Sequence, residues 1–66
     1  MRKRFIILNE ADISSSVIVR DVDNRVKEFR SAEAANNFAA SRFGSWVVIR
    51  QSMQRGVWMS ENVIEA

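Results

Sequence analysis

The stretch Ser31–Gly44, SAEAANNFAASRFG, decides the expected fold because it carries the clearest helical pattern in the chain. Ser31 is a residue type that caps helix N-termini, and Glu33 suits the positive end of the helix dipole. Gly44 suits a left-handed residue just past the last turn. We therefore predict a helix between these two ends.

One side of this helix is expected to be apolar. The residues that recur at helical spacing on that side are Ala35, Phe38, Ala39, Arg42 and Phe43. The residues expected to point outward are Glu33, Asn36, Asn37 and Ser41. Because two of the apolar residues are alanines, the helix can lie close on a sheet, and we interpret the apolar side as core.

A strand is expected ahead of the helix at Arg4–Glu10, RFIILNE. The run consists of β-favouring residues and is bounded by charge. Its apolar side chains alternate, with Phe5 and Ile7 on one side and Ile6 and Leu8 on the other. This strand is therefore predicted to be buried on both faces.

The segment Val17–Phe29, VIVRDVDNRVKEF, is expected to form a β-hairpin. Its turn, Asp21–Asn24, has the composition of a type I turn that ends in a left-handed residue. With a three-residue loop, Val17 and Val19 share the core face with Phe29, whereas a two-residue loop would shift this register.

The segment Ser45–Ser60, SWVVIRQSMQRGVWMS, is expected to form two closing strands. The turn is predicted at Gln51–Arg55, with Gly56 supplying a bulge or a positive φ. Read with period two, Val47 and Ile49 are placed on the core side, although the sequence does not decide which face the helix covers. The tail after Ser60, ENVIEA, could dock or fray.

These elements in the order β-β-β-α-β-β predict an α+β domain that spans residues 1–66. It should contain a single antiparallel sheet of four to five strands with one helix on a face. A chain of 66 residues buries only about 60% of its unfolded surface, so its stability is expected to be marginal. Without cysteine, oligomerisation is the remaining external support.

The charge of the chain is modest but unevenly placed. The pI of about 9.9 reflects a net charge of only +2, because no His, Cys or Tyr titrates at intermediate pH. No acid lies between Ala34 and Ser60, where the basic residues are Arg42, Arg50 and Arg55. A second basic cluster, Arg2, Lys3 and Arg4, opens the chain.

Catalysis is not expected, and neither is a cofactor or a metal. Asp21 and Asp23 flank a turn, where aspartate commonly bonds the local backbone. The serines at 14–16 have no His or Lys partner at a spacing typical of a catalytic nucleophile and its base, and the sequence contains no Gly-rich phosphate loop. The apolar run in RKRFIIL is too short for a signal peptide or a membrane span, so we expect a cytoplasmic protein.

The binding signal comes from arginine and tryptophan in the closing strands and at the basic N-terminus. One helix covers one face of a sheet, so at least one indole is expected to be partly exposed near an arginine. The alternative is that both indoles fill the small core. The candidate residues for binding protein or nucleic acid are Trp46, Arg50, Arg55, Trp58, Arg42, Arg2, Lys3 and Arg4.

Three functions follow from these residues. The first is a non-catalytic module that occupies a surface of a larger host protein or complex. The second is a nucleic-acid binder that uses the arginines and the basic N-terminus on phosphates and stacks a tryptophan on a base. The third is a homodimer through the open sheet face.

Two resemblances bear on this choice. The strand-hairpin-helix portion, Val17–Ser41, resembles the arm-type DNA-binding domains of phage integrases, which carry far more excess positive charge. The whole layout, RFIIL followed by SAEAANNFAASRFG and SWVVIRQSMQRGVWMS, is similar to small phage-encoded proteins, including some anti-CRISPR proteins. That resemblance implies a stoichiometric binder or inhibitor of a host complex.

Overall fold

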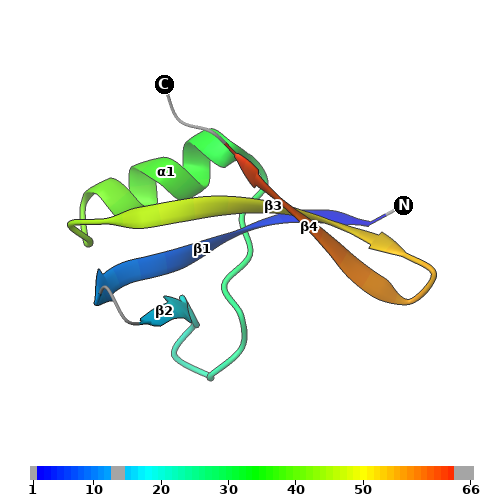
Figure 1. Cartoon of the computed structure of the whole chain (residues 1–66), viewed down its shortest axis with the longest axis horizontal. Coiled ribbons are helices and arrows are strands. Elements are labelled where there is room, and N and C mark those ends of the chain that lie inside the picture. The colour runs from blue at the N-terminus through cyan, green and yellow to red at the C-terminus, as the bar shows by residue number, and fades with distance from the viewer. Residues whose placement is uncertain (1, 13–14, 64–66) are drawn as a thin grey trace.

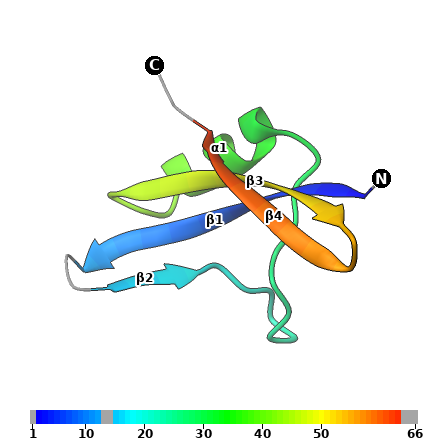
Figure 2. The same ribbon diagram turned by 45° about the vertical axis from the view of Figure 1, so that its right-hand side comes forward.

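The computed structural model of the chain describes residues 2–12 and 15–63, and for residues 11–12 and 15–16 it describes the backbone alone. The elements are β1 (Lys3–Asp12), β2 (Ser15–Ile18), α1 (Ala32–Ala40), β3 (Trp46–Gln54) and β4 (Val57–Val63). The strands form one antiparallel sheet in the order β2-β1-β3-β4, and α1 packs behind β1 and β3 (Figures 1 and 2). The expected α+β class is therefore confirmed, and so is the single antiparallel sheet with one helix.

The third of the five expected strands does not form, so the observed order is β-β-α-β-β. The segment that follows the turn makes isolated bridges, Arg20 to Val26 and Phe5 to Phe29. Phe29 exchanges both backbone hydrogen bonds with Phe5, at 3.1 and 2.9 Å. The segment forms some backbone hydrogen bonds with β1 and others with the residues just after β2. Neither set is continuous, so the segment is not a strand of the sheet.

The predicted turn at Asp21–Asn24 is confirmed. The Asn24 N–H donates to the Asp21 carbonyl at 2.9 Å, and Asn24 is left-handed with φ 68°. Val19 and Phe29 both pack on the core, as expected. Val17 does not, because it lies on the outer strand β2, outside the core cluster, and is 62% exposed.

Helix α1 begins as predicted and ends earlier. The Ser31 hydroxyl accepts a hydrogen bond from the Ala34 N–H at 3.1 Å, which confirms the N-cap. The expected left-handed Gly44 is wrong, since Gly44 has no positive φ. Instead the helix closes at Ser41 with right-handed geometry, and the N–H groups of residues 42 and 43 donate to the Ala39 carbonyl.

The core lies between α1 and the two central strands. Ile7 of β1 and Val48 of β3 are fully buried against Ala35 and Ala39, whose small side chains bring the helix close to the sheet. Phe38 extends this packing, with its ring centroid 5.3 Å from that of Phe29. The predicted apolar side of the helix is thus the core side.

The sequence placed Val47 and Ile49 on the core side, and the structure puts both on the face of the sheet opposite the helix, where Ile49 is nonetheless only 6% exposed. Val48 pairs with Ile7 and packs under α1, so the neighbouring residues of β3 point to the opposite side. The packing of the helix decides this choice, and the alternating apolar pattern of β3 is compatible with either side.

Trp46 is also on the helix side, where it is half-buried. Its indole Nε1–H donates to Oδ1 of Asn36 at 2.9 Å. Asn36 was expected to face solvent, and that expectation is wrong because a half-buried indole needs an acceptor for its N–H.

The closing hairpin turns later than predicted. β3 continues through Gln54, and the loop consists of Arg55 and Gly56, with φ values of 52° and 82°. Two consecutive left-handed residues are what a two-residue hairpin loop of type I′ requires, and Gly56 adopts this conformation without strain. The expected positive φ of Gly56 is therefore confirmed, whereas the turn at Gln51–Arg55 is not. The hairpin projects to one side of the molecule (Figure 1).

The start of the tail belongs to the sheet. Residues 61–63 continue β4, and Val63 packs on the core. The rest of the tail, residues 64–66, lies outside the described residues. In the described part of the chain, no helix has the length and apolar character that crossing a membrane requires.

We predict that Ile7→Val lowers the free energy of unfolding by about 1 kcal/mol, because it removes a buried methylene and leaves a small cavity. Urea denaturation of the purified protein measures this change. Val22→Ala is the matched control, since Val22 lies on a turn and is fully exposed. Equal stability of the two variants would contradict the central place of Ile7 in the core.

Candidate binding site

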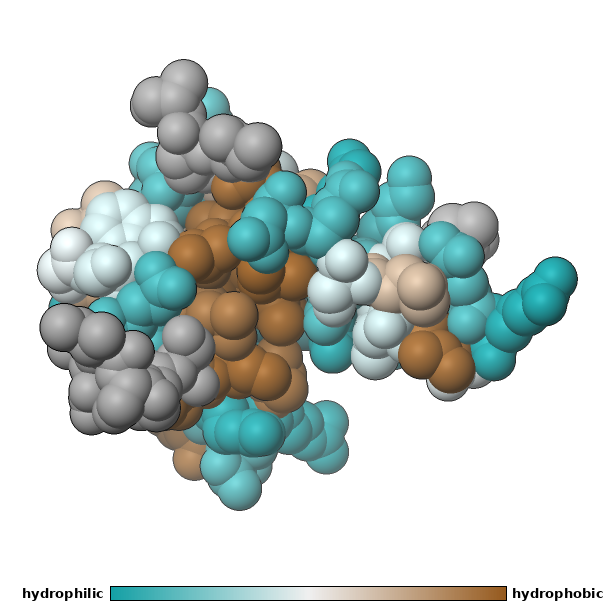
Figure 3. Space-filling model, viewed as in Figure 1, coloured by the Kyte–Doolittle hydropathy of each residue, from teal (hydrophilic) through white to brown (hydrophobic). Residues whose placement is uncertain are grey.

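The face of the sheet opposite α1 carries the candidate site, and we call it the open face. Directly opposed residues of antiparallel strands share a face, so the pairing places Arg4 beside Gln51 and Ile6 beside Ile49. Ile6 and Ile49 are 3% and 6% exposed. Figure 3 shows an apolar surface over the middle of the sheet with polar groups around it.

Two arginines and a tryptophan meet at one end of the open face. The guanidinium carbons of Arg2 and Arg4 lie 5.2 and 4.1 Å from the centroid of the Trp58 ring. The register explains the meeting: the Met53 N–H donates to the Arg2 carbonyl, and Met53 pairs with Trp58 across the hairpin. We refer to Arg2, Arg4, Trp58 and the carboxylate of Glu28 as the Arg–Trp cluster.

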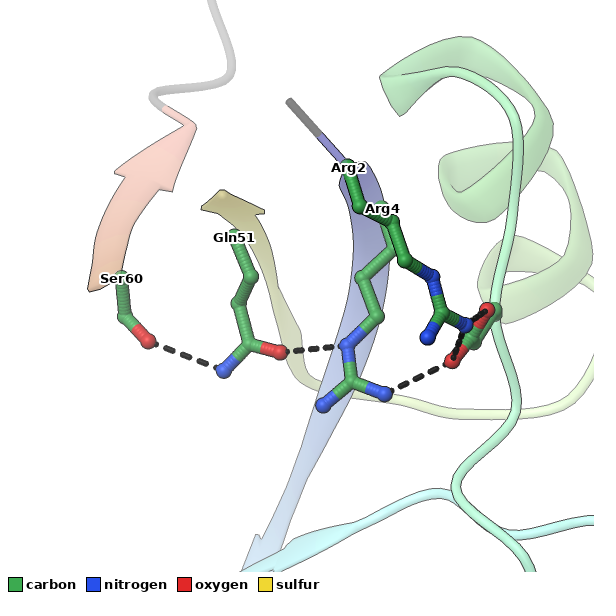
Figure 4. A network of polar contacts seen from close by, with 5 residues as sticks. Arg2, Arg4, Gln51 and Ser60 are labelled. Atoms are coloured by element: carbon green, nitrogen blue, oxygen red, sulfur yellow. Dashed lines mark hydrogen bonds and ion pairs between the residues drawn. The ribbon is translucent and has the colours of Figure 1, made fainter. Parts of the chain in front are cut away.

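A chain of hydrogen bonds holds this cluster and crosses the sheet (Figure 4). On the β4 side, Nε2 of Gln51 donates to the Ser60 hydroxyl at 2.9 Å, and Oε1 of Gln51 accepts from Nε of Arg4 at 2.7 Å. On the other side, Nη1 of Arg4 donates to Glu28 at 2.7 Å, and Nη2 of Arg2 reaches the same carboxylate at 3.1 Å. Arg4 is therefore fixed from both directions.

The two arginines differ in exposure. The Arg4 side chain is 14% exposed, whereas that of Arg2 is 62% exposed. The hydrogen bond from Arg4 holds the pKa of the Glu28 carboxyl below its usual range; the charges of Arg2 and Arg4 act in the same direction, and burial opposes them. Two guanidinium groups on one carboxylate leave one positive charge, displayed mainly on Arg2.

An open pocket of about 520 Å³ adjoins the cluster. It lies between the N-terminal part of β1 and the turn after β2. The residues that line it are Arg2, Arg4, Glu28, Asp21, Arg25 and Val26. Three arginines and two carboxylates give this wall a single net positive charge, which favours an acidic group on a binding partner over a cation.

The other candidate residues from the sequence do not join the cluster. Trp46 lies under the helix, Arg42 stacks on Phe38 at 4.4 Å, and Arg50 forms an ion pair with Glu61 on the side opposite Trp58. Lys3 pairs with Ser52, which places it on the helix side of the sheet, and Arg55 sits in the hairpin loop. Of the eight candidates, the structure thus brings together Arg2, Arg4 and Trp58.

Sequence reasoning missed the three residues that hold the arginines in place. The sequence pattern predicts Gln51 in a turn, and no motif marks Glu28 or Ser60 as site residues. Gln51 and Ser60 are directly opposed on neighbouring strands. The sequence pattern predicts this pairing only if the hairpin loop is placed at Arg55 and Gly56. The contact of Glu28 with Arg4 follows from the bridge between Phe29 and Phe5, which local sequence does not show.

Comparison with known proteins leaves the function to be argued from the structure itself. No family model, curated protein or solved structure matches the chain. In the described residues 2–12 and 15–63, no three His, Cys, Asp or Glu side chains are grouped so that they could hold a metal ion. What the site offers is a cationic and aromatic surface, held by hydrogen bonds, beside an apolar one.

We predict that Glu28→Gln destabilises the protein at neutral pH, and that the difference from the original chain shrinks on acidification. The pKa of Glu28 is lowered in the folded state, so its contribution is present above its ordinary value of 4.5 and is lost as the pH falls through the folded pKa. Because the side chain is 37% exposed, we expect an effect below about 1 kcal/mol. Urea denaturation at neutral and acidic pH measures it; a difference that does not change with pH would contradict the assignment.

Proposed function

We propose that this chain is a non-catalytic binding module that occupies a surface of a larger protein through the Arg–Trp cluster and the adjoining open face. The observation that carries the proposal is the stacking of both guanidinium groups on Trp58. Arginine and tryptophan are the residue types that contribute most to protein–protein binding when they are held in place. The absence of His, Cys and Tyr from the chain supports a role without catalysis.

Preorganisation strengthens this proposal. Arg4 is anchored by Gln51 and Glu28, so a partner that contacts it need not freeze a mobile side chain. The exposed Arg2 supplies the charge, and the half-buried indole of Trp58 supplies apolar area. A surface of this composition fits a protein patch that presents a carboxylate next to apolar side chains.

Nucleic-acid binding is less well supported by the geometry. Two arginines of the sheet are already paired with carboxylates: Arg4 of β1 with Glu28, and Arg50 of β3 with Glu61. These two arginines also point to opposite faces of the sheet, so they do not form one basic track along which phosphates could lie. The resemblance to integrase arm-binding domains therefore gains no support from charge placement.

We predict that a photoreactive benzophenone side chain at position 53 crosslinks to one host protein in cells, because Met53 pairs with Trp58 and lies beside it on the open face. The same group at position 33 should give no such product, since Glu33 is exposed on α1, which covers the other face of the sheet. Mass spectrometry of the products identifies the partner. Equal crosslinking from both positions, or none from position 53, would refute the proposed surface.

We predict that Arg2→Glu weakens retention of that partner by about tenfold or more, because it reverses the exposed charge of the cluster. Arg30→Glu is the matched control, since it makes the same charge change at an exposed residue outside the cluster. Circular dichroism confirms that both variants fold. An equal loss in both variants would mean that only net charge matters.

We predict that labelled duplex and single-stranded oligonucleotides show no change in fluorescence anisotropy with this protein, even at low salt. Binding that weakens steeply as salt is added would contradict this expectation and favour the nucleic-acid alternative. The measurement needs no knowledge of the protein partner, so its outcome is independent of the crosslinking experiment.

A further inference from the structure

The outer edge of β4 has no partner strand in the described part of the chain, because β4 is the last strand of the sheet. Exposed edge strands are usually protected by lysine, proline, a bulge or short length. β4 is seven residues long, and its sequence, VWMSENV, contains none of these protective residues. Its single charge, on Glu61, is already paired with Arg50 on the neighbouring strand.

The geometry of the hairpin determines which backbone groups this edge presents. The loop of Arg55 and Gly56 makes Gln54 and Val57 the first hydrogen-bonded pair of the hairpin. In an antiparallel ladder, alternate residues point their N–H and C=O groups to opposite sides. The residues of β4 whose backbone groups point away from β3 are therefore Trp58, Ser60 and Asn62.

We infer that β4 pairs with β4 of a second copy of this chain, antiparallel and centred on Ser60. In that register Trp58 lies opposite Asn62, and their outward backbone groups form the hydrogen-bonded pairs of the new ladder. A two-fold axis through Ser60 makes the contact self-complementary, as a closed dimer requires. The sheet then continues through eight strands.

The side chains of β4 suit this register. On the helix side of the sheet, Val57 would meet Val63 of the second copy, and Met59 would meet the stem of Glu61. Val57 and Met59 are 58% and 51% exposed in the single chain, so pairing covers apolar surface that is otherwise in water. No like charges oppose each other, since Glu61 is the one charged residue in the strand.

The accessible area of the single chain is larger than the size of the protein predicts for a monomer, which is compatible with association. Its accessible area is 5018 Å², whereas a monomeric protein of 7.6 kDa is expected to expose about 4,300 Å². The projecting hairpin, seen in Figure 2, contributes to this excess. Because one strand pair is a small interface, we expect a dissociation constant in the micromolar range.

Pairing through β4 also has a consequence for binding, which rests on the proposed function, whereas the dimer itself does not. Directly opposed residues of two antiparallel strands point to the same face of the sheet, so both copies would present Trp58 on the same side of the joined sheet. Each Trp58 lies two residues from the two-fold axis at Ser60, so the backbones of the two Trp58 residues would lie about 14 Å apart. The dimer would thus offer two Arg–Trp clusters side by side to a symmetric or repetitive partner surface.

Sedimentation equilibrium of the purified chain, from low to high micromolar concentration, tests the inference. The original protein should shift from monomer to dimer. Ser60→Pro removes an outward N–H and no backbone bond to β3, and should weaken the dimer by tenfold or more. It also removes the hydroxyl that accepts from Gln51, a loss that the alanine variant shares. Ser60→Ala keeps the backbone and should dimerise like the original. A monomer at all concentrations, or a dimer that Ser60→Pro leaves intact, would overturn the proposal.

A second measurement does not depend on how the proline variant folds. Amide hydrogen exchange of the original chain should slow with rising concentration at Trp58, Ser60 and Asn62, and should stay unchanged at exposed Val22. Exchange at these three amides that is independent of concentration would refute pairing through β4. Failure of the partner crosslinking experiment would leave this result standing, so the two proposals fail separately.

Discussion

The packing of Ile7 and Val48 under α1 controls the rest of this structure. Both side chains are fully buried against Ala35 and Ala39, whose small side chains let the helix lie close to the sheet. Because side chains alternate along a strand, this contact sends the neighbouring residues of β1 and β3 to the opposite face. The position of the Arg–Trp cluster is therefore a consequence of how one short helix docks.

The open face shows how a small domain manages a sheet that only one helix covers. Its middle is apolar, with Ile6 and Ile49 nearly buried, and one end is built from polar bonds that run from Ser60 to Glu28. Arg4 is central to that chain, since it joins β3 to the segment before the helix and stacks on Trp58. The same bonds that hold the face together preorganise Arg4 and support the exposed Arg2 beside it, so structural and binding roles of these residues overlap.

Local sequence predicted those features whose cause is local. The Ser31 cap and the left-handed Asn24 each depend on a residue and its near neighbours, and both were predicted correctly. Gly44 failed as a helix end because Ser41 already closes the last turn. The third strand failed because Phe29 pairs with a residue 24 positions earlier in the chain, a contact that no short-range pattern encodes.

The sequence by itself determined the α+β class, the start of the helix, the first strand, the two closing strands and the types of residue available for binding, because periodicity, caps and turns act over a few residues. The tertiary structure alone decided which face the helix covers, where the last hairpin turns and which arginines meet Trp58. Both faces of β3 are apolar enough to be core, so the choice depends on long-range packing energy. That choice places Arg2, Arg4 and Trp58 together and leaves Trp46, Arg42 and Arg50 in structural contacts.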